Sequence, residues 1–293
     1  MKRFIFAIIL VLAFCADSFA LNLRPYMQTP PEVQVFAKRV IEDGGQIVDL
    51  EFCQKYTRLS KQLLTWSNGK FVGDANMGVK LDASGVSVQT LYDLSGNNND
   101  AVQATVGNQP VWTQNVQGGR AGLVFDGIND ILITANTISI SGNTPRTLQL
   151  CFLIDPITIH PHVFGWGDQA SLNTMFKIIV TSPAGSTGTW TLWGRGGGND
   201  WETAISVTAG AFMNHVITYD GATADWFRNG LSSGTSNHVW ITTATTAEIG
   251  KGAIEGAPFT GKVLTSSIFN AALTTTQRTA LETFFGHSYY SIY

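Results

Sequence analysis

Apolar and polar residues alternate in short runs over most of this chain. After Trp66 the runs are rich in Val, Ile, Thr, Phe and Trp, and Gly- and Asn-rich turns separate them about every ten residues. That spacing predicts many short strands, stacked as a β-sandwich or closed as a barrel. The predicted strands include residues 147–154, 176–181, 189–193, 204–207, 215–219, 225–228, 247–249 and 262–269.

Before this region, apolar residues recur at helical spacing. Pro31 suits the first position of a helix, and Glu32 suits the positive end of its dipole. Gly44-Gly45 would end this helix, and a second one follows. Residues 31–65 are therefore predicted to form a helical hairpin, whose apolar faces need the β region or another protein as a partner. Those faces carry Val33, Phe36, Val40 and Ile41, and then Val48, Phe52, Tyr56, Leu59 and Leu63.

A further helix is predicted near the C-terminus. Thr274 suits an N-cap, and Gln277 stands at the capping-box position. Leu281, Phe284 and Phe285 would dock this helix on the sandwich. The pattern thus predicts an all-β protein with a short N-terminal helical hairpin and a C-terminal helix.

The first 20 residues have the features of a secretion signal. A basic start precedes an apolar stretch of 11 residues, which is too short to span a bilayer comfortably. Ser18 and Ala20 are small residues at the spacing that a signal peptidase requires, so we expect an exported mature chain that begins at Leu21. The alternatives are a lipoprotein modified at Cys15 and an uncleaved membrane anchor.

Composition argues against several classes of function. Charged residues make up 13% of the chain, and the formal net charge is −3 at pH 7. No basic stripe would neutralise phosphates, so nucleic acid is not an expected partner. No other long apolar segment follows the signal, so the mature chain is not expected to span a membrane. Cys53 and Cys151 are expected to be buried free thiols, with one disulfide as the alternative.

Turn clusters after residue 75 occur in a definite order. SGNNND at residues 95–100 and DGIND at residues 126–130 each follow a short apolar run, and Gly, Asn and Asp tolerate the backbone of tight turns. Asp220-Gly221 and Asn229-Gly230 then delimit the strands of a hairpin. From residue 259 the chain closes with FTGKVLTSSIFNAALTTTQRTALETFFGHSYY.

These motifs, in this order, resemble those of the laminin-G-like, concanavalin-A-like jelly-roll family over about residues 75–293. The resemblance implies a concanavalin-A-like jelly-roll β-sandwich at residues 76–293. A signal peptide at residues 1–20 and an extended leader with the helical hairpin at residues 21–75 would precede it. In this family the fold serves recognition at a surface or polysaccharide chemistry. A helical lead-in to such a jelly roll also resembles arrangements in bacteriophage virion surface proteins.

A glycoside hydrolase needs two carboxylates that face each other across a groove. Laminarinase-type enzymes of this fold place them on one strand as E-x-D-x-x-E, and this chain has no such string. Asp49-Leu50-Glu51 is the nearest imitation, but it lies in the predicted helical hairpin. The chain is therefore predicted not to be an enzyme.

Two turns gather oxygen-bearing side chains that suit Ca²⁺, which takes six to eight oxygen ligands. Similar domains sometimes hold calcium near one rim of the sandwich, so Ca²⁺ is the candidate cofactor. The same side chains also satisfy turn backbones without any metal, and this is the favoured interpretation of each turn. The candidate ligands are Asp93, Asn97, Asp100, Asp126, Asn129 and Asp130.

Tryptophans around a Gly-rich loop are the candidates for ligand contact. Sugars stack on exposed aromatic faces, and neighbouring amides, carboxylates and guanidinium groups hydrogen-bond their hydroxyls. The alternative is that these tryptophans fill the core, as Trp190 and Trp226 are expected to do. The candidate ligand-binding residues are Trp166, Trp193, Arg195, Asn199, Asp200 and Trp201.

Three functions follow from these observations. The first is a non-enzymatic recognition module, lectin-like or adhesive, that binds a glycan or another receptor at a surface. The second is a structural virion protein, a spike or capsid-associated component, that assembles through residues 21–75 with copies of itself or a virion partner. The third is a polysaccharide hydrolase or lyase. The apparent signal peptide argues against the second function, because most phage virion proteins assemble in the cytoplasm.

Overall fold

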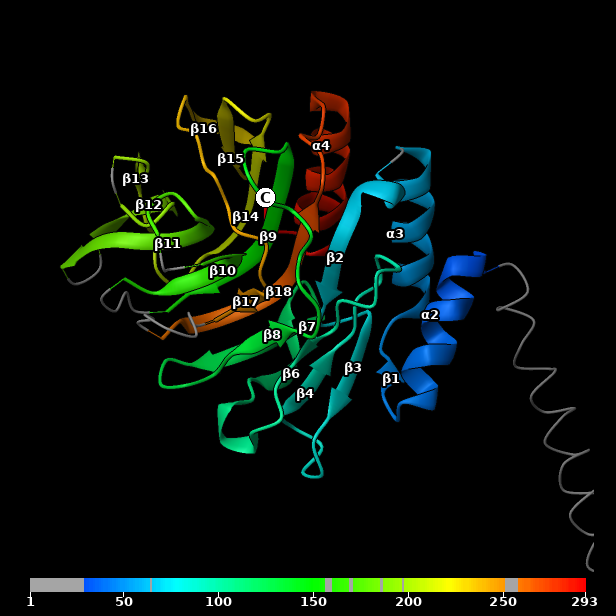
Figure 1. Cartoon of the computed structure of the whole chain (residues 1–293). Helices are drawn as coiled ribbons and strands as arrows, with labels where there is room; N and C mark the ends of the chain where they lie inside the picture. Colours follow the sequence, from blue (N-terminus) through cyan, green and yellow to red (C-terminus); the bar gives the residue numbers. More distant parts are fainter. Residues whose placement is uncertain are drawn as a thin grey trace, which may run out of the picture.

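The alternating runs pair into two antiparallel sheets, and helices cover one side of the sandwich (Figure 1). Within the part of the chain that the structure describes, no helix is long and apolar enough to cross a membrane. The predicted signal peptide lies outside that part. The computed structural model describes residues 29–63, 65–155, 160–168, 171–184, 187–196, 198–250 and 258–293.

Sheet A has ten strands, and its order brings together residues from both ends of the jelly roll. Its central strand β17 pairs with β8 on one edge and with β10 on the other. In spatial order the strands are β1 (Gln46–Ile47), β3 (Gly78–Leu81), β4 (Val88–Leu91), β5 (Ala101–Val102), β8 (Leu132–Thr134), β17 (Ala247–Ile249), β10 (His162–Gly167), β11 (Met175–Ala184), β12 (Thr187–Trp193) and β13 (Trp201–Ser206).

Sheet B has eight strands built around β18, which pairs with β9 along one edge. The other edge of β18 pairs with β7 at its start and with β2 at its end. In spatial order the strands are β16 (Leu231–Ser236), β15 (Ala224–Arg228), β14 (Phe212–Tyr219), β9 (Arg146–Ile154), β18 (Thr260–Phe269), β7 (Arg120–Asp126) and β6 (Val111–Gln117), with β2 (Gly69–Asp74) beside β18. The jelly-roll sandwich predicted from the sequence is confirmed.

The helices form where their caps predict them. Helix α2 (Pro31–Glu42) begins with proline, and the Asp49 side chain accepts from the Phe52 N–H to cap α3 (Leu50–Gln62). Thr274 and Gln277 form the predicted capping box of α4 (Thr275–Glu282), which continues into the π-helix η4 (Thr283–Tyr289). Two short 3₁₀ turns are η2 (Trp66–Asn68) and η3 (Val106–Asn108).

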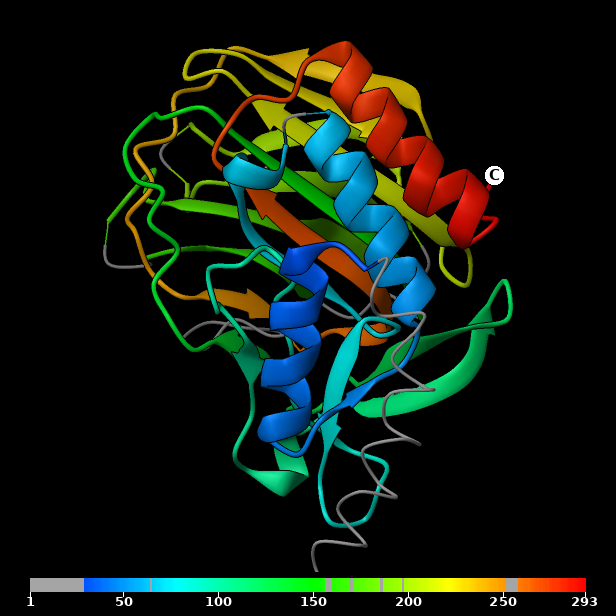
Figure 2. The ribbon, with the colours of Figure 1, turned by 90° about the vertical axis from the view of Figure 1, so that its right-hand side faces the viewer.

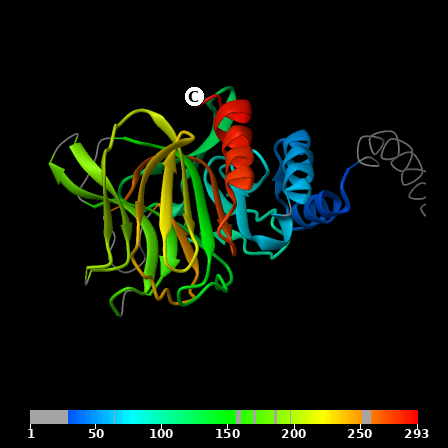
Figure 3. The same ribbon diagram turned by 90° about the horizontal axis from the view of Figure 1, so that it is seen from above.

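Two apolar clusters hold the layers together. The larger one fills the space between the sheets and includes Phe152, Trp190 and Trp226. The second joins the outer face of sheet B to α3 and α4, which lie side by side in Figures 2 and 3, and it includes residues of α2, which packs on β1 and β3 of sheet A. Phe52 of α3 stands at its centre, stacked on Tyr289 with ring centroids 3.5 Å apart. The partner of the helical hairpin is therefore the jelly roll.

The second cluster also contains the two remaining cysteines. Cys53 of α3 and Cys151 of β9 are both fully buried and both free, as the sequence led us to expect. Burial raises the pKa of each thiol above its usual range, because the charged thiolate is poorly solvated there. The two thiols act as small apolar side chains in this cluster.

A buried carboxyl group ties the C-terminal segment to this cluster. Asp74 at the end of β2 is 0% exposed and accepts from the Tyr290 hydroxyl at 2.5 Å. It also accepts from the Asn76 backbone N–H at 2.7 Å. Burial raises the pKa of Asp74 to about 7, against the lowering effect of these hydrogen bonds.

Candidate functional site

The six residues predicted to bind a ligand do not share one surface. Trp166 and Trp201 belong to the cluster between the sheets and are 0% and 9% exposed. The Trp166 indole N–H donates to the Ile140 carbonyl at 3.2 Å, and Trp201 packs edge-to-face on Trp226. Both side chains therefore stabilise the sandwich core in this structure.

Asp200 organises the Gly-rich loop between β12 and β13. Its Oδ1 accepts from the N–H groups of Gly194 and Gly196, each at 2.9 Å. Arg195 between them has φ of +77°, in the left-handed region that few residues other than glycine adopt. Asn199 is half-buried in the same loop. The loop is thus held in shape beside the end of β12, which carries Trp193.

Trp193 lies on the outer face of sheet A. It pairs directly with Lys177 of β11, and directly paired residues project from the same face of a sheet. Its ring centroid is 4.9 Å from that of His162 on β10. Because β11 separates these two strands, their backbones are about 9.6 Å apart, so the indole leans across β11.

The residues around this indole are polar and mostly paired. Lys177 forms an ion pair with Glu248 of β17, on the same face. His162 is 5% exposed, and burial lowers its pKa to about 3, so it is neutral at physiological pH. On the far side, exposed Glu202 accepts from the hydroxyls of Thr181 and Thr189.

The first predicted calcium turn uses its carboxylates internally. Asp93 is fully buried, and its two oxygens accept from the N–H groups of Val72, Ser95 and Asn99 and from the Ser95 hydroxyl. The Asp100 carboxylate accepts from the Asp93 N–H and pairs with Arg39. The Asn97 amide donates to the Gly69 carbonyl. Protein donors thus already occupy the carboxylate oxygens of Asp93 and Asp100, which argues against a calcium ion at this turn.

The second turn has fewer internal bonds. Asp126 accepts from the N–H groups of Ile128 and Asn129, and Asp130 accepts from the Asp126 N–H. Burial raises the pKa of Asp130 to about 6, and the charge of Asp126 adds to this shift. These two carboxylates and one amide would need backbone carbonyls or water to complete the six to eight oxygens that calcium takes, so calcium at this turn stays a prediction. Among the described residues, no three His, Cys, Asp or Glu side chains cluster as a metal site would require.

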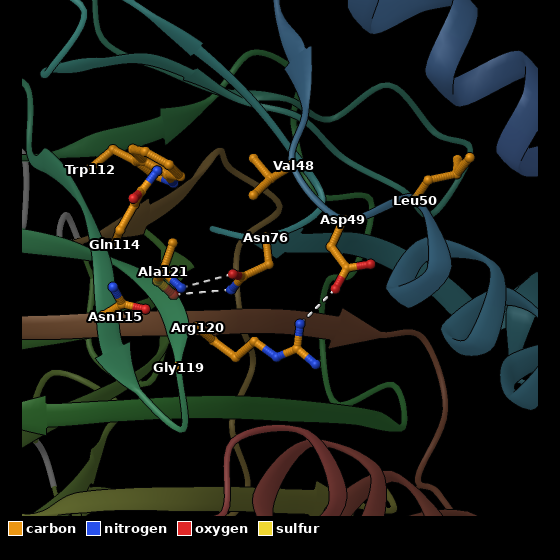
Figure 4. A pocket seen from close by; sticks show the side chains of 10 residues that line it. All are labelled: Val48, Asp49, Leu50, Asn76, Trp112, Gln114, Asn115, Gly119, Arg120 and Ala121. Atoms are coloured by element: carbon orange, nitrogen blue, oxygen red, sulfur yellow. Dashed lines mark hydrogen bonds and ion pairs between the residues drawn. The ribbon is translucent and has the colours of Figure 1, made fainter. Parts of the chain in front are cut away.

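A polar cavity of about 390 Å³ opens between the start of α3 and the β6–β7 hairpin (Figure 4). On one side, Asp49 receives hydrogen bonds from Arg120 at 2.8 Å and from the Tyr289 hydroxyl at 3.1 Å. The Arg120 guanidinium also lies 4.1 Å from the centroid of the Tyr289 ring, which fixes its position. The cavity is lined by Val48, Asp49, Leu50, Asn76, Trp112, Gln114, Asn115, Gly119, Arg120 and Ala121.

Hydrogen bonds to the backbone make the floor of this cavity rigid. Asn76 exchanges bonds of 2.8 and 3.0 Å with the backbone of Ala121, as the dashed lines in Figure 4 mark. The Trp112 indole N–H donates to the Ala75 carbonyl at 2.9 Å. The Asn76 amide also donates to the buried Asp74, so the floor is linked to the hydrogen bond between Asp74 and Tyr290.

Sequence reasoning did not find this cavity. Its residues come from four segments between residues 48 and 121, which only the tertiary fold brings together. The nearest signal was Gly118-Gly119, which predicts a tight hairpin but not what the hairpin faces. In the sequence, Asp49 stands out only as part of Asp49-Leu50-Glu51, which imitates the carboxylate string of a glycoside hydrolase.

Comparison with known proteins bears on the jelly roll. The family model of the concanavalin A-like lectin/glucanases superfamily matches residues 150–277. These residues run from β9 to the first turn of α4 and include β10–β13, on which Trp193 and its neighbours lie. The resemblance expected from the sequence motifs is thereby confirmed. No curated protein is significantly similar to the chain.

Solved structures with this fold include both binding domains and glycoside hydrolases. Domain 4 of AbnA, an extracellular arabinanase from Geobacillus stearothermophilus solved with arabinotriose, has a TM-score of 0.53 and 15% identity over 73% of this chain and 98% of its own. The binding domain of Paraclostridial Mosquitocidal Protein 1 has a TM-score of 0.54 and 14% identity over 74% of this chain and 52% of its own. An arabinofuranosidase solved with arabinofuranosyl-α-1,2-xylobiose has a TM-score of 0.55 and 10% identity over 74% and 58%. These likenesses show the fold alone.

Proposed function

We propose that this protein is a non-enzymatic recognition module that binds glycan through the outer face of sheet A. The observation that carries the proposal is the position of Trp193, a half-buried indole that leans across β11 toward His162. Thr181, Thr189 and Glu202 supply oxygen atoms on the same face.

Sugar rings suit such a surface. The apolar C–H face of a sugar stacks on an indole, and its hydroxyl groups bond to polar side chains beside it. The Gly-rich loop that Asp200 holds would form one border of the site, with Arg195 and Asn199 next to it. Trp193 would therefore be the main contact, and the loop residues would select among sugars.

The carboxylates on this face support binding rather than hydrolysis. Glu202 lies on β13 and Glu248 on β17, with three strands between them, so about 19 Å separates their backbones. Glycosidases need their two carboxyl groups about 5–9.5 Å apart. Glu248 is moreover neutralised by Lys177. These two glutamates are therefore too far apart to act together as a glycosidase pair.

Glycan-array binding by the purified protein tests the proposal. We expect selective binding, with affinity at least tenfold lower in Trp193→Ala, because a buried aromatic contact contributes about 1.4 kcal/mol or more. Trp193→Phe should retain part of the affinity. Leu231→Ala, at an exposed apolar residue of β16, is the matched control and should bind normally. Absence of glycan binding, or binding unchanged in Trp193→Ala, would disprove the proposal.

We also propose that the protein acts outside the cell, as its N-terminal sequence indicates. Recovery from the medium of a chain that begins at Leu21 would support export, and retention of the full chain in cells would contradict it.

Assembly is a second candidate function. Helix α2 leaves Val35 and Ile41 exposed at 68% and 58%, and exposed apolar residues favour contact with another chain. A concentration-dependent oligomer that Val35→Ser disrupts would support a virion-like role. A monomer at high concentration would count against it.

A further inference from the structure

The cavity in Figure 4 lies far from Trp193 along the order of the sheets, and no function is yet assigned to it. It is formed by the β6–β7 hairpin and by the loop before α3, neither of which lies within residues 150–277. Its volume of about 390 Å³ falls in the range of about 300–1,000 Å³ that is typical of small-molecule sites.

Two amide side chains line this cavity without internal partners. Gln114 and Asn115 are exposed, and neither side chain forms a hydrogen bond to the described part of the chain. Asn115 sits where the β6–β7 register shifts, with φ of +54°. A β-bulge redirects a side chain out of the regular alternation, so Gln114 and Asn115 line the same cavity although they are neighbours.

The cavity has the chemistry of a site for a neutral polar ligand. Its charged residues are Asp49 and Arg120, which pair with each other. The Asp49 oxygens already accept from the Phe52 N–H, Arg120 and the Tyr289 hydroxyl, so this carboxylate serves as a structural anchor. The guanidinium has five N–H donors, and its bond to Asp49 uses one.

An aromatic ring supplies the cavity with an apolar wall beside its polar groups. The Trp112 indole N–H is held by the Ala75 carbonyl, which orients the ring along the cavity wall. Trp112 and Gln114 alternate on β6 and so project from the same face of that strand. An aromatic wall, two free amides and a guanidinium can receive the C–H face and the hydroxyl groups of a sugar ring.

We propose that this cavity is a second glycan site, which binds one neutral sugar unit of an oligosaccharide. The inference rests on the proposed function for its ligand class, but its residues are separate from those around Trp193. Trp112 stacks on the sugar, while Gln114, Asn115 and Arg120 bond to its hydroxyl groups.

The test is an array of neutral oligosaccharides, including arabino-, xylo-, gluco- and galacto-oligosaccharides, probed with four purified forms of the protein. The cavity variant is Gln114→Ala/Asn115→Gly, in which glycine accepts the left-handed backbone that Asn115 adopts. Thr113→Ala is the control, since this exposed residue projects from the opposite face of β6. Trp193→Ala and the wild type complete the set, and equal melting temperatures would show that the surface variants fold.

We expect a group of neutral glycans whose binding falls at least tenfold in the cavity variant and is kept in Thr113→Ala and Trp193→Ala. If the cavity variant binds like the wild type while Trp193→Ala loses binding, the second site is disproved and the proposed function stands. If only the cavity variant loses binding, the cavity is the site and the assignment to Trp193 fails. If the wild type binds no glycan, both proposals are overturned.

Discussion

The outer faces of the two sheets differ in what covers them. On sheet B, helices α3 and α4 cover the outer face (Figure 2), and Cys151 and Phe269 are fully inaccessible, while α2 packs on β1 and β3 at one end of sheet A. On sheet A, the strands β10–β13 present a half-buried Trp193 and an exposed Glu202. The first face is therefore part of the core, whereas the second carries polar and aromatic side chains that solvent reaches in part. The same alternating sequence pattern produces both, and the added helices make the difference.

Even the covered face of sheet B contains polar side chains. Gln149 and Asn214 are both 0% exposed, and the Gln149 amide donates to the Asn214 carbonyl oxygen at 3.2 Å. Thr147 bonds to the Ala271 carbonyl and accepts from the Leu273 N–H. Such pairs limit the desolvation cost of burying polar groups. The helices thus cover a face that was not simply apolar.

Removal of the central ring under the helices should have the largest effect. Phe52→Ala deletes a buried ring that stacks on Tyr289 and Phe284, and we expect the free energy of unfolding to fall by about 3–5 kcal/mol. Urea denaturation would measure the loss. Val35→Ala on the exposed side of α2 is the control and should cost less than about 0.5 kcal/mol. A loss below about 1 kcal/mol for Phe52→Ala would mean that packing of the helices on the sheet contributes little to the stability of the fold.

The buried Asp74 should make stability depend on pH. Its pKa is about 7 in the folded protein and 3.8 in a model peptide, so the folded state binds the proton more tightly. The stability that this group contributes is present below about pH 4 and is lost as the pH rises through 7. At 1.36 kcal/mol per pKa unit, the loss is at most about 4 kcal/mol.

Asp74→Asn isolates this contribution. The amide stays neutral, and the Tyr290 hydroxyl can accept from it while it donates to the Leu264 carbonyl nearby. We therefore expect the variant to be more stable than the wild type, by a margin that is largest at pH 8 and clearly smaller at pH 5, in urea denaturation at both values. Burial also raises the pKa of Glu282 to about 7, so part of the pH dependence should remain in the variant. An identical pH dependence in both proteins would contradict the assignment to Asp74.

Trp193 should matter little for stability although it lies on the same strand as the buried Trp190. Trp190→Ala, three residues away on the opposite face of β12, should cost about 3–5 kcal/mol because Trp190 is 1% exposed. Trp193→Ala should cost about 1 kcal/mol, since half-buried residues lose less contact. Thermal denaturation of the two variants compares the faces directly. Equal losses would show that Trp193 belongs to the core and has no free face for a sugar.

Chelation should have the smallest effect. Because protein donors occupy the oxygens of Asp93, we expect EDTA to change the melting temperature by less than about 1 °C. Asp93→Ala, by contrast, should lower it clearly, as four hydrogen bonds lose their acceptor. A large decrease with EDTA that calcium reverses would restore the predicted metal site, most directly at Asp126 and Asp130.

Local signals in the sequence predicted most of the elements correctly. Pro31, the capping box at Thr274 and Gln277, and the Asn229-Gly230 turn each act within a few residues, so their outcome depends little on the rest of the fold. The face that each tryptophan occupies was harder to predict. Trp193 and Trp201 bracket one loop, yet the first faces outward and the second packs between the sheets.

The sequence by itself determined the helices, the strands, their turns and the superfamily resemblance, because these depend on spacing and on the residues next to one another. Only the tertiary structure decided which carboxylates were free and where a cavity formed. Asp93 accepts from the N–H of Val72, 21 residues away, and Asp49 at the cavity pairs with Arg120, 71 residues away. Contacts between such distant residues are set by how the sheets and helices stack, and no local pattern along the chain encodes that stacking.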